Sequence, residues 1–188
     1  MKNSLKGSLI FLLLLLPFVH TDLNFHQKKQ KGIKMDFKIL SSSFKEGESI
    51  PDKYGYYIEN ASPPLNWTNP PAGTKSIALL VDDPDAPVGD WVHWIVFNIP
   101  PNINELKEGA SSKKLLPKGS IEGLNDFRKN NYGGPCPPSG THRYYFKLYA
   151  LDNILSLKEN TTKKQLLEAM KGHILAQTTL IGTYRRKS

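Results

Sequence analysis

Apolar and polar residues follow strand-like patterns in several short segments of this chain, which is 188 residues long. Residues 76–81 form a continuous apolar run bounded by turn residues, which is typical of a buried strand. Strict alternation in residues 91–99 would place apolar side chains on both faces, so we expect that strand to be covered on both sides. The strands that these patterns predict are 36–40, 76–81, 91–99, 143–151 and 177–184. Residues 63–67 are expected to be extended, because each proline disfavours helix at the residue before it.

The pattern changes to helical spacing near the C-terminus. Thr162 and Gln165 fit a capping box at the start of a helix. The apolar residues that follow at helical spacing are Leu166, Leu167, Met170 and Ile174. Gly172 is a minor defect within this helix, and residues 102–108 predict a further short helical turn. Since strands and helices do not alternate and no segment repeats, we expect a mostly β domain with a few peripheral helices.

The charge of the chain argues against a nucleic-acid partner. The length suits one domain, and the net charge is +8. Residues 1–34 hold six lysines and one aspartate, so they carry +5 of this charge and residues 35–188 carry only +3. A basic leader or linker explains that distribution better than a nucleic-acid surface does.

Cys136 is the single cysteine, so no disulfide forms within the chain, and we interpret it as a packed residue.

Residues 1–20 have the pattern of a secretory signal peptide. Lys2 and Lys6 precede an eleven-residue apolar run, 9–19, which is shorter than the roughly 20 residues that a membrane span needs. We therefore predict a signal peptide at 1–20, a basic linker at 21–34, and export to the periplasm or the outside of the cell. The alternative is a cytoplasmic protein whose translation starts at Met35, because the expected cleavage region has no pair of small residues.

Candidate chemistry gathers in two stiff loops that each lead into an aromatic strand. The first is Asp-Asp-Pro-Asp-Ala-Pro at 82–87, followed by His93 within Trp-Val-His-Trp. The second is Gly-Gly-Pro-Cys-Pro-Pro-Ser-Gly-Thr-His-Arg-Tyr at 133–144, which contains His142. Prolines restrict both loops and suit a preorganised site. If the two strands are neighbours, Asp83, Asp85 and both histidines meet at one end of a sheet.

Three kinds of chemistry fit these side chains. A metal site is disfavoured because no closely spaced pair of histidines is present, and we predict no metal and no cofactor. Hydrolysis lacks a nucleophile elbow, and Ser139 lies in a loop without an evident oxyanion partner. The remaining interpretation is an anion pocket, in which carboxylates hold the histidines protonated. Gly134 and Gly140 would let the backbone approach the ligand.

These two loops resemble the signature of the phosphatidylethanolamine-binding protein family, in its bacterial, Raf-kinase-inhibitor-like branch. The resemblance includes Glu-Asn-Ala-Ser-Pro-Pro-Leu-Asn-Trp at 59–67 and Arg-Tyr-Tyr-Phe-Lys-Leu-Tyr-Ala-Leu at 143–151, and it extends over about residues 35–184. It implies a large antiparallel β-sheet packed on a smaller one, with helices at the edge. It also implies a small pocket for phosphate-like groups and phospholipid heads. The residues that match the family's pocket are Asp83, Asp85, Pro87, His93, Pro138, His142 and Tyr144, with the Tyr132 phenol beside Gly134 as a further candidate.

The resemblance implies a non-enzymatic binding protein, and the alternative is a hydrolase or other enzyme that uses the same residues. We expect a small anionic ligand, a phospholipid head group, or a phosphorylated or acidic peptide, and binding that weakens as pH rises through the histidine pKa values. Inhibition of a kinase or protease is implied by the resemblance alone, and a vestigial pocket on an interaction protein is the third alternative. Arg128 stands where the branch usually has glycine, which predicts either a different loop path or a cation at the pocket mouth. The sequence predicts no oligomeric state.

Overall fold

The computed structural model describes residues 36–111 and 114–186. The predicted signal peptide at 1–20, the predicted linker at 21–34 and the alternative start at Met35 lie outside these residues. Export and its cytoplasmic alternative therefore stay predictions.

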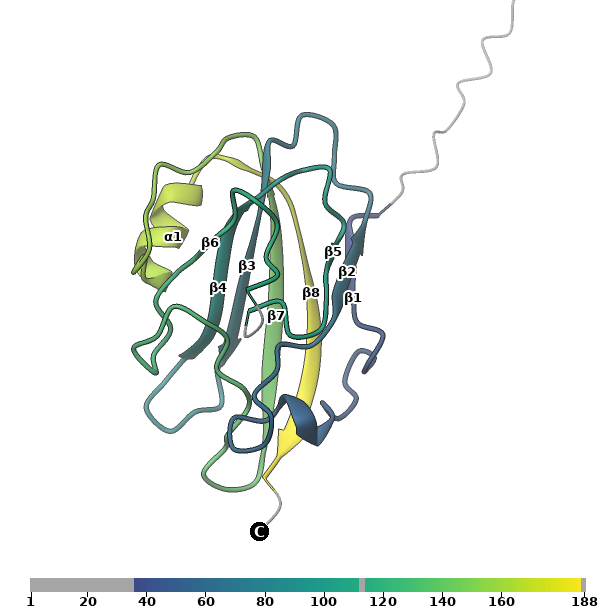
Figure 1. Ribbon diagram of the computed structural model, residues 1–188, viewed down its shortest axis with the longest axis vertical. Coiled ribbons are helices and arrows are strands. Elements are labelled where there is room, and N and C mark those ends of the chain that lie inside the picture. The colour runs from purple at the N-terminus through teal and green to yellow at the C-terminus, as the bar shows by residue number, and fades with distance from the viewer. Residues whose placement is uncertain (1–35, 112–113, 187–188) are drawn as a thin grey trace, which may run out of the picture. The chain divides into compact units, whose positions relative to one another are not determined.

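Two antiparallel sheets form the fold, as expected (Figure 1). The smaller sheet has the order β1 (Lys38–Leu40), β2 (Leu65–Thr68), β5 (Glu105–Leu106). The larger sheet has the order β6 (Ile121–Glu122), β4 (Trp91–Ile99), β3 (Ser76–Asp83), β7 (Thr141–Leu151), β8 (Ile174–Arg185). A 3₁₀ turn, η1 (Asp52–Tyr54), and one helix, α1 (Lys163–Met170), complete the elements of the described residues.

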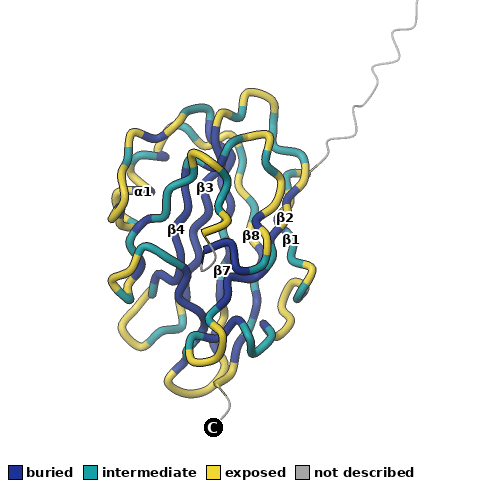
Figure 2. The backbone as a smooth tube through the Cα atoms, in the orientation of Figure 1, coloured by how far each residue is buried: buried dark blue, intermediate teal, exposed yellow. Residues whose placement is uncertain are grey.

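Both faces of the larger sheet are covered, so the prediction for β4 is confirmed. The smaller sheet covers one face, where Trp67 packs in the same core as Trp94. Helix α1 covers the other face, where Leu166 and Met170 join a core with Leu80. Burial follows from these layers: all eight residues of β3 are buried, and the exposed positions lie mainly in the loops (Figure 2).

The predicted strict alternation along β4 is wrong, because two β-bulges interrupt it. Trp94 pairs with Val81 while Val92 pairs with the next residue of β3, so His93 is an extra residue in the ladder. A second irregularity lies near Asn98, which has a φ of 56°. A bulge bends a strand and redirects side chains, and it is common beside functional sites. The first bulge therefore sets the position of a predicted ligand-binding histidine.

Helix α1 has the predicted capping box but ends earlier than predicted. The Gln165 side chain accepts from the Thr162 backbone N–H at 2.9 Å, and the Thr162 hydroxyl accepts from the Gln165 backbone N–H. The helix stops at Met170 because Gly172 takes a φ of +79°, and Ile174 begins β8 instead of extending the helix. No helix in the described part of the chain is long and apolar enough to cross a membrane.

The predicted helical turn at 102–108 is also wrong. Glu105 and Leu106 form β5 and pair with Asn66 and Leu65 of β2. Leu106 is buried in the core beneath the smaller sheet. Pairing with β2 satisfies backbone groups that one isolated helical turn would leave to water, so tertiary pairing decides the conformation.

Candidate functional site

A small cavity opens where β3 ends and β4 begins, beside the start of β7. Its volume is about 180 Å³, roughly six times the share of one water molecule in the liquid. The predicted residues that line it are Asp83, Pro87, His93, Pro138 and Tyr144. Of the predicted residues, Asp85, Tyr132, Gly134 and His142 do not line it. The structure thus brings together one carboxylate, one imidazole and one phenol.

Both carboxylate oxygens of Asp83 are held by neighbouring groups. Oδ2 lies 2.8 Å from Nδ1 of His142, and Oδ1 accepts a 2.8 Å hydrogen bond from the Asp85 backbone N–H. Since a carboxylate can only accept, Nδ1 of His142 carries the proton. His142 is itself buried, with 7% of its surface exposed. In this structure His142 orients Asp83 from behind the cavity wall.

Asp85 fixes the proline-containing loop to β7 instead of facing the cavity. Its two oxygens accept from Nε and Nη2 of Arg143 at 2.9 and 2.7 Å, and Oδ2 also accepts from the Arg143 backbone N–H. Hydrogen bonds from Arg143 lower the pKa of Asp85 to about 2. A bidentate ion pair of this kind holds a carboxylate in one orientation. Asp85 therefore anchors the loop that presents Asp83.

His93 is neutral at physiological pH. Its Nδ1 lies 2.6 Å from the Gly133 carbonyl oxygen, to which it donates, so Nε2 is left as the acceptor of the ring. Burial lowers the pKa of His93 below its ordinary value and outweighs the opposing effect of the Gly133 hydrogen bond. The expectation that carboxylates keep this histidine protonated is wrong, because its desolvation is larger than its attraction to Asp83.

Tyr144 lies within the cavity wall. The residue is 1% exposed, and its ring meets the His93 ring edge-on with centroids 5.1 Å apart. Its hydroxyl makes no hydrogen bond of normal geometry within the described residues, although the Cys136 backbone and the Asp83 carboxyl group lie close to it. Burial, followed by the charge of Asp83, raises the pKa of this phenol well above its usual range, so it keeps its proton. A buried, unpaired donor is unfavourable and needs an explanation.

Tyr132 and Gly134 pack against the Tyr54 backbone and do not line the cavity. The Tyr132 hydroxyl donates to the Tyr54 carbonyl oxygen at 3.2 Å, and its ring packs edge-on against Trp94 in the core. A Cβ atom on Gly134 would lie 2.1 Å from the same Tyr54 oxygen. The sequence interpretation placed a ligand against this glycine, whereas the structure places a neighbouring backbone segment there.

The cavity combines two hydrogen-bond acceptors with one donor. Asp83 and Nε2 of His93 can accept, and the Tyr144 hydroxyl can donate. Among the described residues, no group of three His, Cys, Asp or Glu side chains is placed to hold a metal ion. The chemistry of the cavity is therefore hydrogen bonding to a ligand that carries at least one proton of its own.

Comparison with known proteins identifies the family. The phosphatidylethanolamine-binding protein model matches residues 40–185. The chain belongs to the phosphatidylethanolamine-binding protein family. A UPF0098 protein of the archaeon Methanothermobacter thermautotrophicus is 50% identical over 148 residues, which are 79% of this chain and 98% of that protein. Family members similar to this chain thus occur in archaea as well as bacteria, beyond the bacterial branch that the motifs suggested.

Two solved structures of bacterial homologues have the same fold. One is a putative family homologue from Chlamydia trachomatis, with a TM-score of 0.74 and 44% identity over 80% of this chain and 98% of that chain. The other is YbcL of E. coli, described as a new member of the mammalian family, with a TM-score of 0.77 and 33% identity over 81% of this chain and 100% of that chain. These similarities support the two-sheet architecture across nearly the whole length of both homologues.

Sequence reasoning missed several residues that line the cavity of this family member. Phe127 stacks on Tyr56 with centroids 4.5 Å apart and meets the His93 ring at 5.4 Å. The other lining residues that were not predicted are Ala86, Val88, Trp91, Cys136 and Pro137. Most of them flank predicted residues in the two loops, which was the available signal. Phe127 comes from a third segment, and only the folded chain brings it to the cavity.

Arg128 keeps the backbone conformation of the glycine that the family branch usually has at this position. Its φ is 62°, and its N–H donates to the Asn125 carbonyl oxygen at 3.0 Å. The side chain does not line the cavity of Asp83 and His93. It lines a different cavity beside α1. Arg128 therefore adds no cation to the wall of that cavity, because neighbouring residues of this loop line different cavities.

Proposed function

We propose that this protein is a non-enzymatic binding protein whose cavity holds a small, singly protonated phosphate-like group. The observation that carries the proposal is the buried Tyr144 hydroxyl, which lacks a partner and lies among the residues that line the cavity. A ligand oxygen that accepts from this hydroxyl would remove the unfavourable burial of an unpaired donor. The ligand would bind as a head group, because the cavity volume of about 180 Å³ is small for a whole lipid.

The charges of the cavity select the protonation state of the ligand. Asp83 lies on the wall and burial favours the neutral form of His93, so a phosphate dianion would meet a carboxyl group, with no lysine or arginine among the residues that line the cavity. A monoanion can instead donate its P–OH proton to an acceptor and accept from Tyr144. Alternatively, His93 takes up a proton as the anion binds. Both routes bring one proton with the ligand, so affinity falls as pH rises.

The groups on the cavity wall favour binding over catalysis. Cys136 is the wall residue with a nucleophilic side chain, and burial raises the pKa of its thiol above the ordinary value. Since the thiolate is the nucleophile, a raised pKa disfavours attack at neutral pH. Ser139, the other candidate considered from the sequence, does not line the cavity. A hydrolase with a covalent intermediate would need an activated nucleophile, which neither the Cys136 thiol nor Ser139 provides here.

The ligand class leaves three sources of the same chemistry: a free phosphate compound, a phospholipid head group, or a phosphorylated peptide. The family's name points to the second source, and the resemblance to kinase inhibitors points to the third. An acidic peptide would use a protonated carboxyl group in the same way. Any inhibition of a kinase or protease would follow from occupation of this cavity.

Titration of the protein with phosphate, phosphoethanolamine, acetate and a phosphoserine peptide, followed by amide NMR, tests the proposal. We expect saturable shifts at Asp83, His93 and Tyr144, and an affinity that is lower at pH 8 than at pH 6. Replacement of Tyr144 by Phe should weaken binding about fivefold, the effect of one hydrogen bond of about 1 kcal/mol. No shifts at millimolar ligand, or an affinity that does not change with pH, would contradict the proposal.

A further inference from the structure

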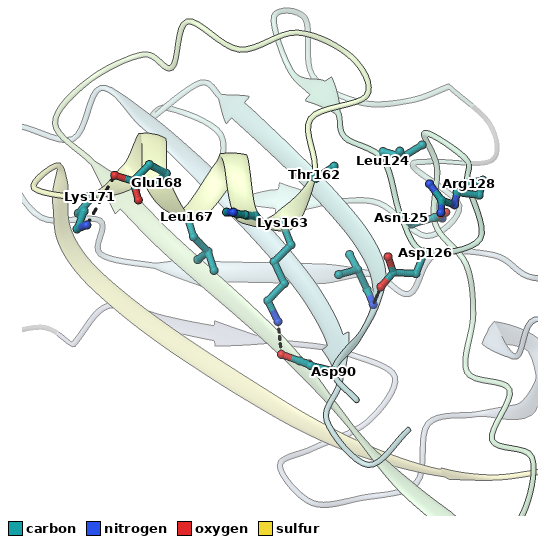
Figure 3. A pocket seen from close by; sticks show the side chains of 12 residues that line it. Asp90, Leu124, Asn125, Asp126, Arg128, Thr162, Lys163, Leu167, Glu168 and Lys171 are labelled. Carbon is teal, nitrogen blue, oxygen red and sulfur yellow. Dashed lines mark hydrogen bonds and ion pairs between the residues drawn. The ribbon is translucent and has the colours of Figure 1, made fainter. Parts of the chain in front are cut away.

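A second, larger cavity lies on the opposite side of β4 from the smaller sheet, between this strand and α1. Its volume is about 730 Å³, within the range of cavities that hold small organic ligands. Three segments form it: the start of β4, residues 124–128, and helix α1 (Figure 3). We call it the α1 groove. No residue of the Asp83–Tyr144 cavity lines it.

Several charged residues of the α1 groove already have partners. Lys163 extends to Asp90 at the start of β4, as Figure 3 shows, and it also donates to the buried Asp82 at 2.7 Å. Glu168 and Lys171 form an exposed ion pair at 3.6 Å on α1. The Lys163 pairs fix the helix against the sheet, and together these pairs leave little net charge of their own.

Two cations of the α1 groove remain uncommitted. Arg128 and Lys164 have no carboxylate partner within residues 36–111 and 114–186. The nearby Asp126 uses Oδ2 to accept from the Val92 backbone N–H at 2.7 Å. Helix α1 also begins with two lysines and has no acidic residue in its first turn, so its positive end is not compensated. The groove thus has unpaired positive charge on two of its three segments.

Apolar side chains form the rest of the wall. Leu167 of α1 is 40% exposed, although it directly follows the buried Leu166 and is about one turn from the buried Met170. Val92 and Leu124 contribute further apolar surface from the sheet side of the groove. A leucine left open on a wall that also carries unpaired cations matches a ligand with an apolar chain and an anionic group.

We infer that the α1 groove binds a small amphiphilic anion. The phosphate or carboxylate group lies between Arg128 and Lys164, and the apolar chain lies on Leu167 and Val92. The groove is separate from the cavity of the proposed function and does not depend on it. Charge complementarity selects the anionic group, and burial of apolar surface supplies the rest of the affinity.

Octyl phosphate below its micelle-forming concentration is the probe, with inorganic phosphate and 1-octanol as the two halves of the ligand. We expect saturable amide shifts at Lys164 and Leu167 with octyl phosphate. Its affinity there should exceed that of inorganic phosphate by about tenfold or more, since burial of two methylene groups suffices for that factor. It should exceed that of 1-octanol by about fivefold, the contribution of two exposed charge pairs. Shifts at Tyr144 report the other cavity separately in the same spectra.

The test variant is the double substitution R128G and K164A. Glycine suits the φ of 62° at position 128, and alanine suits an exposed helix position, so this variant keeps the fold. Loss of two exposed charge pairs should weaken octyl phosphate binding about fivefold. The matched control is K75A, an exposed lysine before β3 that does not line the groove.

Four outcomes would overturn the inference. They are equal affinity in wild type and the double variant, equal affinity for octanol and octyl phosphate, equal affinity for inorganic phosphate and octyl phosphate, and shifts confined to Asp83, His93 and Tyr144. Binding only to anionic vesicles, with none to monomeric octyl phosphate, would assign the cations to a membrane surface and would also overturn it. Shifts at Lys164 with no shifts at Tyr144 would refute the proposed function and leave this inference standing.

Discussion

Replacement of Tyr144 by Phe should make the protein more stable and its ligand binding weaker. The hydroxyl of Tyr144 is buried and makes no hydrogen bond of normal geometry within the described residues, with the Cys136 backbone and the Asp83 carboxyl group close by. Leaving such a donor unpaired costs about 1–3 kcal/mol, while removing one oxygen atom leaves little empty space. We therefore expect the free energy of unfolding to rise by about 1 kcal/mol, which corresponds to about 2–4 °C in Tm for a domain of this size.

Tyr132 provides the matched control, because it is also a buried tyrosine in the same core. Its hydroxyl donates to the Tyr54 carbonyl oxygen at 3.2 Å, so Tyr132→Phe leaves that oxygen without this donor. The same chemical change should then lower the free energy of unfolding by about 1 kcal/mol. Urea unfolding of both variants, each in ligand-free buffer, compares the two signs directly.

Opposite signs are the decisive feature of this comparison. If Tyr144→Phe destabilises the protein as much as Tyr132→Phe does, the Tyr144 hydroxyl has a partner in the ligand-free state. The reasoning behind the cavity would then be wrong. If stability rises but phosphate affinity stays unchanged, the unpaired hydroxyl does not serve the ligand, and the proposed geometry of binding is refuted.

Three further predictions concern the surroundings of the site. Gly134→Ala should lower the free energy of unfolding by about 3 kcal/mol in urea, because its Cβ would overlap the Tyr54 carbonyl oxygen; wild-type stability would contradict the close approach. Arg143→Ala should raise the pKa of Asp85 from about 2 towards 3.8, and NMR of the side-chain carboxyl group measures this pKa. The stability from this pair is present above about pH 4 and is lost as pH falls towards 2, so the variant should lose that part of the acid dependence. Thr162→Ala should cost about 1 kcal/mol by removing the N-cap, and Tm unchanged within error would argue against the capping box.

The strands could be predicted because few other conformations would bury their apolar residues. Residues 76–81 and 91–99 are apolar on both faces, and only a covered sheet can bury both faces of an extended segment. The capping box at Thr162 is a local signal and needs no knowledge of the fold. The end of α1 and the fate of residues 102–108 were not predictable in this way, because the pairing of β8 and β5 with other strands decides them.

The members of the site were predictable, but most of their roles were not. The motifs identified five wall residues. They could not distinguish a residue that lines the cavity from a residue that orients it through hydrogen bonds. Asp83 faces the cavity, while Asp85 and His142 act through hydrogen bonds to the loop and to Asp83. The bulge at His93 depends on the register between two strands, which no single segment encodes.

The two aspartates that end β3 explain why both cavities lie at this end of the sheet. Successive residues of a strand face opposite sides, so Asp82 and Asp83 point into different layers. Asp82 is fully buried and accepts from Lys147 and Lys163 at 2.8 and 2.7 Å, whereas Asp83 is paired with His142. Buried charges are weak evidence for stability, since desolvation offsets their attraction. They do fix geometry: Lys163 holds α1 at the groove, and His142 holds Asp83 at the cavity. The strand end is thus arranged around paired charges, and an ordinary apolar core could not hold polar groups ready for a ligand on both faces.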